Sequence, residues 1–289
     1  MSRSSGGASF YLPGGAPFFF RGGPVGCLCL HGLQAVPQEV RWLGERLAAQ
    51  GCTVYGPRLA GHGTSVADLR RTTWRDWYGS ALDGYHILRG QCRQVFVLGL
   101  SLGGLLSLYL GAQEQPDGVV SMASMLELDL PLLPYARYLK WLWRYTPKRR
   151  DAHFHRIDAR LRELQARRGE PVIGRASYGQ FPLASLAELY ALMQAARPRL
   201  PALTAPLLLI HSEADRTVPV RNQALIASLV GTPAADLHTL RLRTCDHLLT
   251  LDVEMDTVFE AVTAFVARYA GQEQPPASVA PGADGRARE

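Results

Sequence analysis

The chain alternates short apolar runs with longer segments of helical periodicity, and this order restricts the fold more than any other feature of the sequence. Val25–Leu30 and Gln94–Leu100 are apolar along most of their length, which is typical of strands buried on both faces. Strands and helices in alternation predict βαβ units, and therefore an α/β fold with a mainly parallel central sheet flanked by helices. The other expected strands are Thr53–Tyr55, Val119–Met122, Pro206–Ile210 and Leu237–Leu242, and the expected helices are Val40–Ala49, Leu102–Gly111 and Val253–Tyr269.

One stretch interrupts the alternation. From about Leu126 to Pro201 no strand pattern is evident, and prolines separate helical patches at Tyr135–Tyr145, Asp151–Arg168 and Leu183–Arg197. We interpret residues 126–201 as a helical insertion between two strands of a core made of residues 17–125 and 202–270. Residues 1–16 are expected to form an N-terminal arm. Residues 271–289, rich in proline, alanine, glycine and charge, are expected to be a disordered tail.

Charge and cysteine content argue against several classes of protein. The 289 residues carry a formal net charge of +6, but the arginines are scattered, densest over residues 137–168, and form no stripe alternating with aromatic residues. We therefore expect no nucleic-acid partner. Five cysteines are an odd number without zinc-like spacing, which predicts neither a disulfide framework nor a metal site. Cys27 and Cys29 alternate in a predicted strand, so we expect both on one of its faces.

The sequence shows no membrane-directing pattern. No run of about 18 apolar residues occurs, so a membrane-spanning helix is not expected. The first seven residues lack the basic segment and long apolar stretch of a signal peptide. We therefore expect a cytoplasmic protein whose thiols remain reduced.

The segment Gly99-Leu-Ser-Leu-Gly103 fits the nucleophile-elbow pattern G-x-S-x-G. A serine at a sharp strand-to-helix turn leaves no room for side chains two residues before and after it. The predicted strand that ends at Leu100 and the apolar helix that starts at Leu102 supply this context. Ser101 is therefore the candidate nucleophile. The alternative is an ordinary glycine-rich turn that joins a strand to a helix.

A serine hydroxyl needs a neighbouring base that is held by a carboxylate, and the elbow predicts the chain order serine, acid, histidine. His247 follows the last predicted strand and Asp215 follows the strand that ends at Ile210, so we expect these two as base and acid. Glu213 is a rival for the acid, although it lies closer to the strand. Asp246 precedes His247 directly, which is a poor position for gripping its ring, and it is expected to face solvent or an arginine.

The remaining histidines have other expected roles. His31 ends a strand before Gly32 and is expected to orient the following loop rather than act as base. His62 lies between two glycines and is expected to brace a turn. His153 and His155 lie on the insertion, where a metal role is a remote alternative.

A tetrahedral intermediate needs backbone N–H groups directed at its oxyanion. The residue after the nucleophile supplies one of them, which is Leu102 here. The loop after the strand Val25–Leu30 is expected to supply the second from Leu33.

In its motifs the chain resembles bacterial carboxylesterases and monoacylglycerol lipases of the α/β-hydrolase superfamily. The resemblance covers roughly residues 17–268. It implies the α/β-hydrolase fold, a triad of Ser101, Asp215 and His247, an oxyanion hole at Leu33 and Leu102, and a small helical cap over the acyl pocket. The matching segments are Leu30-His-Gly-Leu33, Arg58-Leu-Ala-Gly-His-Gly63, Thr73-Trp-Arg-Asp-Trp77, the elbow and the segments of Asp215 and His247. The insertion, rich in arginine and tryptophan (Trp141, Trp143, Arg149, Arg150), departs most from the family.

The resemblance implies hydrolysis of carboxylic esters through an acyl-enzyme, with no cofactor. A thioesterase, an amidase or a carbon–carbon bond hydrolase with the same triad is the alternative, and a non-catalytic binding protein of this fold is a remote one. The leucine-rich insertion suggests short or medium acyl chains or monoacylglycerols as substrates, unless these leucines only pack the helices of the cap. Its basic face also suggests transient contact with anionic lipid.

Overall fold

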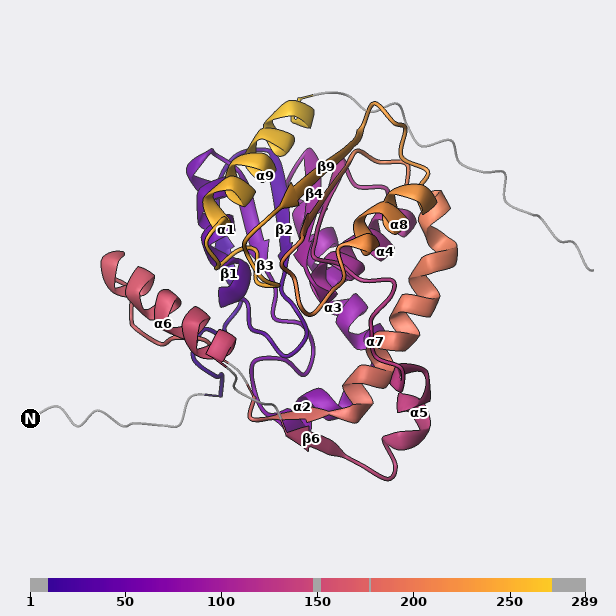
Figure 1. Ribbon diagram of the computed structural model, residues 1–289. Helices are drawn as coiled ribbons and strands as arrows, with labels where there is room; N and C mark the ends of the chain where they lie inside the picture. The colour runs from indigo at the N-terminus through magenta and orange to yellow at the C-terminus, as the bar shows by residue number, and fades with distance from the viewer. Residues whose placement is uncertain (1–9, 148–151, 177, 272–289) are drawn as a thin grey trace, which may run out of the picture.

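The computed structural model describes residues 10–147, 152–176 and 178–271, and these residues form a seven-stranded sheet in the order β1-β3-β2-β4-β5-β8-β9. All neighbouring strands are parallel except β1, which pairs antiparallel with β3 at one edge. The predicted α/β fold with a mainly parallel sheet is confirmed (Figure 1). The strands are β1 (Phe18–Phe20), β2 (Val25–Leu30), β3 (Thr53–Gly56), β4 (Gln94–Leu100), β5 (Gly118–Met122), β8 (Leu207–Ser212) and β9 (Leu237–Leu242).

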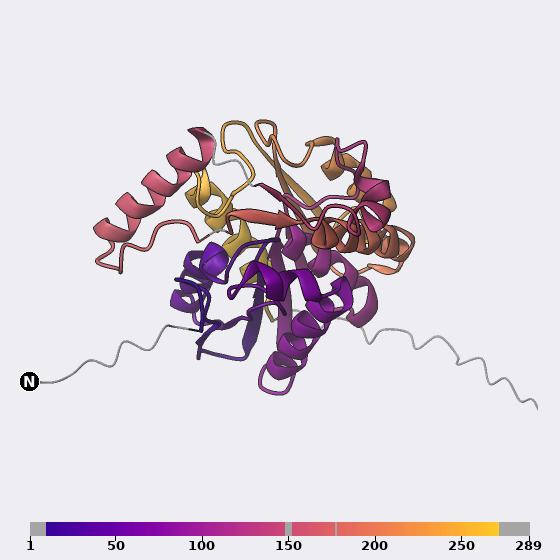
Figure 2. The same cartoon turned by 90° about the horizontal axis from the view of Figure 1, so that it is seen from below.

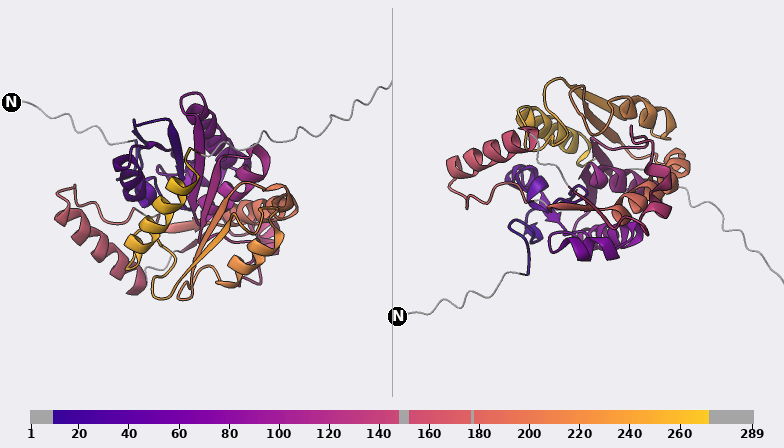
Figure 3. Two further views of the ribbon diagram at one scale, coloured as in Figure 1. Left: turned by 90° about the horizontal axis from the view of Figure 1, so that it is seen from above. Right: turned by 60° about the horizontal axis from the view of Figure 1, so that its bottom comes forward.

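Helices cover both faces of the sheet because both faces of its central strands are apolar. Cys27 and Cys29 of β2 pack, as expected, on the same side as α1 (Gln38–Ala49) and α9 (Met255–Tyr269). Leu28 and Leu30 alternate with these cysteines and pack on the other side. That side is covered by α3 (Trp74–Arg89), α4 (Leu102–Glu114) and α8 (Arg221–Leu229). Figure 3 shows α9 lying along the α1 side, away from α8.

The strand order reverses direction at the middle of the sheet. The chain passes from β2 through α1 to β3 on one side, whereas β4 pairs with β2 on the other side, with Leu30 opposite Gly99. The loops that follow β2 and β4 therefore leave the sheet next to each other. In open α/β sheets this switch point, at the carboxyl ends of the strands, is where ligands bind.

The segment between β5 and β8 lies across the carboxyl-end edge of the sheet (Figure 2). It is mainly helical, as predicted, but the expectation that it holds no strand was wrong. Two short strands, β6 (Tyr145–Pro147) and β7 (Gln180–Pro182), pair antiparallel with Thr146 opposite Phe181. Partners so far apart in the chain leave no local periodicity by which the pair could be predicted. The helical elements are η1 (Leu133–Tyr135), α5 (Ala136–Leu139), α6 (Ala152–Arg167), α7 (Leu183–Ala196) and η2 (Arg197–Ala202).

The helix predicted at Tyr135–Tyr145 is reduced to the four residues of α5. Short helices are stable mainly where an apolar face packs against the rest of the protein. Trp141 and Leu142 have 82% and 71% of their surfaces exposed, so no such packing extends the helix.

The helix α6 lies at the periphery beside α1 (Figures 1 and 3). The indole Nε1 of Trp42 donates to Glu170 just after α6, at 3.1 Å.

Several elements were not predicted from periodicity: β1, α3, α8 and the short helix α2 (Val66–Arg71). Residues 1–9 of the predicted arm and residues 272–289 of the predicted tail lie outside the described residues, as do Arg149, Arg150 and Asp151. The rest of the arm is bound to the core, since the N–H of Leu12 donates to the carbonyl of Gly63 at 2.8 Å. Within the described ranges, no helix combines the length and apolar character needed to cross a bilayer.

Candidate active site

Ser101 lies between β4 and α4 in a strained backbone conformation, with φ 59° and ψ −116°. Its N–H donates to the carbonyl of Met122 at 2.8 Å, which fixes the turn to the neighbouring strand. A Cβ on Gly99 would lie 2.1 Å from the backbone of Gly103, and a Cβ on Gly103 would lie 2.1 Å from the carbonyl oxygen of Leu30. Both glycines are therefore required by the turn, which has the geometry of a nucleophile elbow.

Ser101, His247 and Asp215 form a continuous chain of hydrogen bonds. The Oγ of Ser101 lies 2.8 Å from Nε2 of His247, and Nδ1 of His247 lies 2.9 Å from Oδ2 of Asp215. A carboxylate only accepts, so Nδ1 carries the proton and Nε2 is left to accept from the serine hydroxyl. The structure thus brings together the three residues that the sequence nominated from segments far apart in the chain.

The Asp215 carboxylate is buried and kept in its charged form. Burial favours the neutral acid, but the interaction with His247 and the N–H groups of Val218 and Thr217 outweigh it, and the pKa of Asp215 is lowered from its ordinary value. Oδ1 accepts from these two N–H groups at 2.9 and 2.8 Å. The loop therefore orients Oδ2 toward the imidazole.

The loop after β2 passes directly beside the serine. A Cβ on Gly32 would lie 3.4 Å from the Cβ of Ser101, and Leu33 is the next residue. Leu102 is the first residue of α4, so its N–H lies in the first turn, where no intrahelical acceptor is available. Both predicted oxyanion-hole residues therefore adjoin Ser101.

His31 orients this loop, as expected, rather than serving as a base. Its Nδ1 donates to the carbonyl of Gly32 at 2.9 Å and its Nε2 accepts from the N–H of Leu59 at 3.2 Å. Complete burial lowers the pKa of His31 to about 4, so the ring is neutral at pH 7. The ring of His62 packs between those of His31 and Trp77, with centroids 5.1 and 5.7 Å apart, and braces the turn.

The rival acids are placed differently. Glu213 is exposed, and its N–H pairs with the carbonyl of Leu242. Asp246 was expected to face solvent or an arginine. It is only 4% exposed and does not face solvent, but its Oδ2 lies 3.8 Å from Nε of Arg216, in agreement with the second alternative. Its Oδ1 accepts from the N–H groups of His247 and Arg216 at 2.7 and 3.0 Å. Asp246 therefore joins the loop of the base to the loop of the acid.

Other supporting residues were missed by the sequence analysis. Glu39 accepts the N–H of Gly32 at 2.7 Å through Oε2. His211 is buried at the end of β8, with Nε2 2.9 Å from the carbonyl of Ser124, and burial lowers its pKa to about 4. The hydroxyl of Ser212 donates to the carbonyl of Cys245. The partners of His211 and Ser212 lie in distant segments, and the contact of Glu39 with Gly32 follows no sequence motif, so no local pattern distinguishes these residues.

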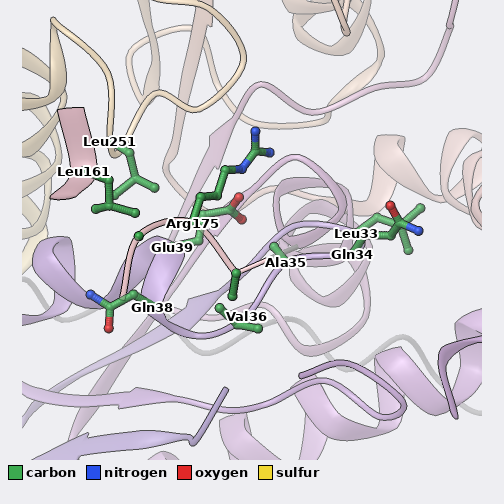
Figure 4. A pocket seen from close by; sticks show the side chains of 11 residues that line it. Leu33, Gln34, Ala35, Val36, Gln38, Glu39, Leu161, Arg175 and Leu251 are labelled. Carbon is green, nitrogen blue, oxygen red and sulfur yellow. The ribbon is translucent and has the colours of Figure 1, made fainter. Parts of the chain in front are cut away.

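The insertion contacts the loop of Leu33 and carries a groove of its own. Nε2 of Gln34, the residue after Leu33, donates to the carbonyl of Gln180 in β7 at 2.9 Å. Ser101 itself is only 8% exposed. An open groove of about 540 Å³ runs between residues 126–134 and α7, with Leu126, Leu128, Leu130, Tyr190 and Met193 in its wall. A small cavity of about 30 Å³ lies between Leu33, Glu39, Leu161 and Arg175 (Figure 4).

Within the described part of the chain, no group of three or more histidine, cysteine or acidic residues is arranged so that it could hold a metal ion. His155 is exposed on α6, and the side chain of His153 lies outside the description.

Comparisons with known proteins show the family of the chain. The family model described as serine aminopeptidase, S33, matches residues 26–254. A thermostable monoacylglycerol lipase of Bacillus sp. (strain H-257) is 35% identical over 263 residues, which are 90% of this chain and 97% of the lipase. A carboxylesterase of Bacillus subtilis (strain 168) is 27% identical over 251 residues, 86% of this chain and 95% of the esterase.

Among solved structures, one reported with the metagenome-derived lipolytic enzymes LipS and LipT has a TM-score of 0.76 at 27% identity, covering 89% of this chain and 99% of the other. The monoacylglycerol lipase of Paleococcus ferrophilus has a TM-score of 0.70 at 16% identity, and the match covers 88% of this chain and 99% of the lipase. At this identity the likeness concerns the fold alone. The chain belongs to the serine aminopeptidase S33 family of α/β hydrolases.

Proposed function

We propose that this chain, a serine hydrolase of carboxylic esters, acts through an acyl-enzyme on Ser101, with His247 as general base, Asp215 as its orienting acid and the N–H groups of Leu33 and Leu102 as the oxyanion hole. The observation that carries the assignment is the hydrogen-bond chain from Oγ of Ser101 through His247 to the buried Asp215 carboxylate. A strained serine at the switch point of the sheet supports it.

The proposed reaction has two stages, acylation of the serine and hydrolysis of the acyl-enzyme. Oγ of Ser101 attacks the ester carbonyl carbon while Nε2 of His247 takes its proton. The carbonyl oxygen becomes an oxyanion, which accepts from the two backbone N–H groups. The intermediate then expels the alcohol, which receives the proton from His247. A water molecule, deprotonated by the same ring, attacks the acyl-enzyme and releases the acid and the free serine.

We propose short or medium acyl esters or monoacylglycerols as substrates and residues 126–201 as the cap over the acyl chain. The leucine-lined groove and the names of the two Bacillus relatives support this class.

The family description raises an aminopeptidase as the second candidate. Such an enzyme holds a cationic substrate N-terminus with a carboxylate, but the carboxylates of the groove, Glu127 and Asp129, pair with Arg197 and Arg221. Ester substrates therefore fit better.

The test is hydrolysis of p-nitrophenyl esters from acetate to palmitate by the wild type and Ser101→Ala, with alanine p-nitroanilide as the peptidase probe. We expect a burst and turnover of esters by the wild type and a loss of at least about 10⁴-fold in the variant. Turnover of the anilide alone favours the peptidase. If the wild type takes a fluorophosphonate label but cleaves neither substrate, a thioesterase or carbon–carbon bond hydrolase becomes the better proposal. Absence of labelling contradicts the assignment of Ser101.

We further propose transient docking on anionic lipid through the segment 130–143, which we term the apolar tip. Most of its aromatic and leucine side chains are exposed, although Leu133 is buried. Cations lie among them: Arg137 lies 4.5 Å from the ring centre of Tyr138, and Lys140 lies 5.8 Å from that of Trp141. Aromatic rings with neighbouring cations suit the interface of an anionic bilayer. Leu130 belongs to both the tip and the groove, so a docked tip places the groove beside the lipid. The exposed residues are Leu130, Leu132, Tyr135, Tyr138, Trp141, Leu142 and Trp143.

Vesicle binding tests the docking. Wild type is expected to bind phosphatidylglycerol vesicles more tightly than phosphatidylcholine vesicles, and less tightly as salt is raised, because screening weakens exposed charge pairs. Trp141→Ser with Leu142→Ser is expected to weaken binding at least about 10-fold, since it removes two anchors from the bilayer. Ile87→Ser removes an exposed apolar side chain from α3 and serves as the control. Salt-insensitive binding, or equal loss in the control, contradicts the proposal.

We also propose a reducing, cytoplasmic location. All five cysteines are free and buried, which supports a role as small core residues rather than as disulfide partners. Fractionation of the cells that produce the protein tests this location.

A further inference from the structure

A buried carboxylate is present next to the predicted oxyanion hole and has no role in the reaction described above. Glu39 lies in the first turn of α1 and is only 8% exposed. Acidic side chains at such positions need hydrogen-bond partners, because burial of an unpaired carboxylate is costly. The partners of Glu39 therefore indicate what it does.

The carboxylate of Glu39 fixes the backbone at Gly32. Its Oε2 accepts the N–H of Gly32 at 2.7 Å, while the carbonyl of Gly32 accepts from Nδ1 of His31 at 2.9 Å. The Gly32 carbonyl and the N–H of Leu33 belong to one planar peptide unit. Glu39 therefore holds the peptide plane before Gly32, and His31 holds the plane that carries the Leu33 N–H.

The main chain of Glu39 holds a second part of the site. Its carbonyl accepts from Oγ1 of Thr250 at 2.6 Å, and Thr250 is a buried residue three positions after His247. Gly32 and Thr250, both partners of Glu39, thus come from the loop of Leu33 and the loop of His247. Glu39 therefore connects the loop of Leu33, the proposed oxyanion donor, to the loop of His247, the proposed general base.

Glu39 acts on the backbone and not on the substrate. A Cβ on Gly32 would lie 3.0 Å from Oε2 of Glu39 and 3.4 Å from the Cβ of Ser101, so the glycine separates the carboxylate from the nucleophile. The cavity that Glu39 and Arg175 both line is about 30 Å³ (Figure 4). This volume suits one or two water molecules and not an acyl chain.

We propose that Glu39 is a positioning residue: it fixes the peptide before Gly32, so that the loop presents the N–H of Leu33 to the oxyanion, and it keeps the loops of Leu33 and His247 in register. The inference rests on the proposed function, in which Leu33 is an oxyanion donor.

Three substitutions separate the hydrogen bond from charge and size. Glu39→Ala removes the acceptor, Glu39→Asp withdraws it by one methylene, and Glu39→Gln keeps a carbonyl oxygen at the same distance. Misplacing a catalytic group by about 1 Å can cost about 10²-fold. We expect Glu39→Ala to lower kcat by about this factor while KM changes by less than about 3-fold. Glu39→Asp should lower kcat by a smaller factor. The kcat of Glu39→Gln should stay within about 3-fold of the wild-type value.

The rates are expressed per active site, counted by fluorophosphonate titration, so that loss of folded protein does not imitate the effect. An alkyl trifluoromethyl ketone, which forms a tetrahedral adduct with an oxyanion, is expected to lose affinity in Glu39→Ala in proportion to kcat/KM. Gln38→Ala alters the neighbouring residue of the same cavity and serves as the control, with kcat unchanged.

Three results overturn the proposal: a kcat per site for Glu39→Ala within about 3-fold of wild type, unchanged affinity for the ketone, or a Glu39→Gln variant as slow as Glu39→Ala. If Glu39→Ala does not fold, a Glu39→Asp variant with wild-type kcat overturns it equally. Failure of the proposed function is recognised separately, because Ser101→Ala then keeps its ester turnover.

Discussion

The turn that carries Ser101 leaves no space for side chains at two of its positions. At Gly99 an added Cβ would meet the carbonyl carbon and oxygen of Gly103 at 2.1 Å, and both atoms belong to the backbone. Backbone atoms cannot rotate away as the end of a side chain can. The chain must therefore open the elbow to accommodate even a methyl group.

Gly99→Ala is accordingly expected to lower the unfolding free energy by about 3 kcal/mol. It should also lower ester turnover per folded molecule by at least about 10²-fold, because Ser101 is displaced. Gly79→Ala is the matched control: this glycine lies inside α3 with nothing within 4 Å of its Cβ, so alanine should stabilise by up to about 1 kcal/mol. Urea unfolding and p-nitrophenyl ester assays check both. Equal behaviour of the two variants contradicts the steric argument.

The residues of the triad could be predicted because each leaves a local sign in the sequence. Gly99 and Gly103 flank Ser101 at fixed spacing, and Asp215 and His247 each follow a strand. Glu39 has no such sign, since its partners Gly32 and Thr250 become neighbours only in the folded chain. The buried position of Asp246 was missed for the same reason, because its hydrogen bonds reach a separate loop.

At the level of elements, the insertion is anchored where it leaves the core. The side chain of Asn222, buried in α8, accepts the N–H groups of Leu126 and Glu127 at 2.7 and 2.9 Å. Its amide donates to the carbonyls of Glu127 and Pro219 at 3.0 and 2.9 Å. One side chain therefore ties the first residues of the insertion to the helix that follows the Asp215 loop.

Asn222→Ala is expected to lower the unfolding free energy by about 3 kcal/mol, because it leaves several buried backbone groups without partners. Ser228→Ala, at an exposed position of the same helix, should change it by less than about 0.5 kcal/mol. Chemical denaturation of both variants measures the difference. A cost for Asn222→Ala no larger than that of the control contradicts the anchoring role.

The elements of the sheet were predictable because a strand buried on both faces must be apolar throughout, as Gln94–Leu100 nearly is. The insertion was less predictable. Its residues pack against the core and against each other over long separations, so β6 and β7 pair without a local pattern. Trp141 and Leu142, which fit a helical period, instead face outward.

The whole molecule carries buried histidines that determine its response to acid. Burial lowers the pKa values of His31 and His211 to about 4 and that of His62 well below 6.5. The unfolded chain binds protons at these positions below pH 6.5, whereas the folded chain does not. Lowering the pH from 6.5 toward 4 therefore favours unfolding.

Each of the three histidines contributes at most about 1.4 kcal/mol per pH unit, so the unfolding free energy should fall by up to about 4 kcal/mol per unit between pH 6 and 4.5. His62→Phe keeps a ring between His31 and Trp77 and should reduce this slope by about 1.4 kcal/mol per unit. Urea unfolding at several pH values measures both slopes. A wild-type curve that is flat across this range contradicts the prediction.

The separation of Ser101 from His247 along the chain has a consequence for synthesis. The two residues lie 146 positions apart, and the imidazole follows the last strand to be made. At 5–20 residues per second, translation adds the histidine about 7–30 s after the serine. During that interval the nascent chain carries a nucleophile without its base. The ribosome-bound protein is thus expected to stay inert toward esters at least until His247 has been translated.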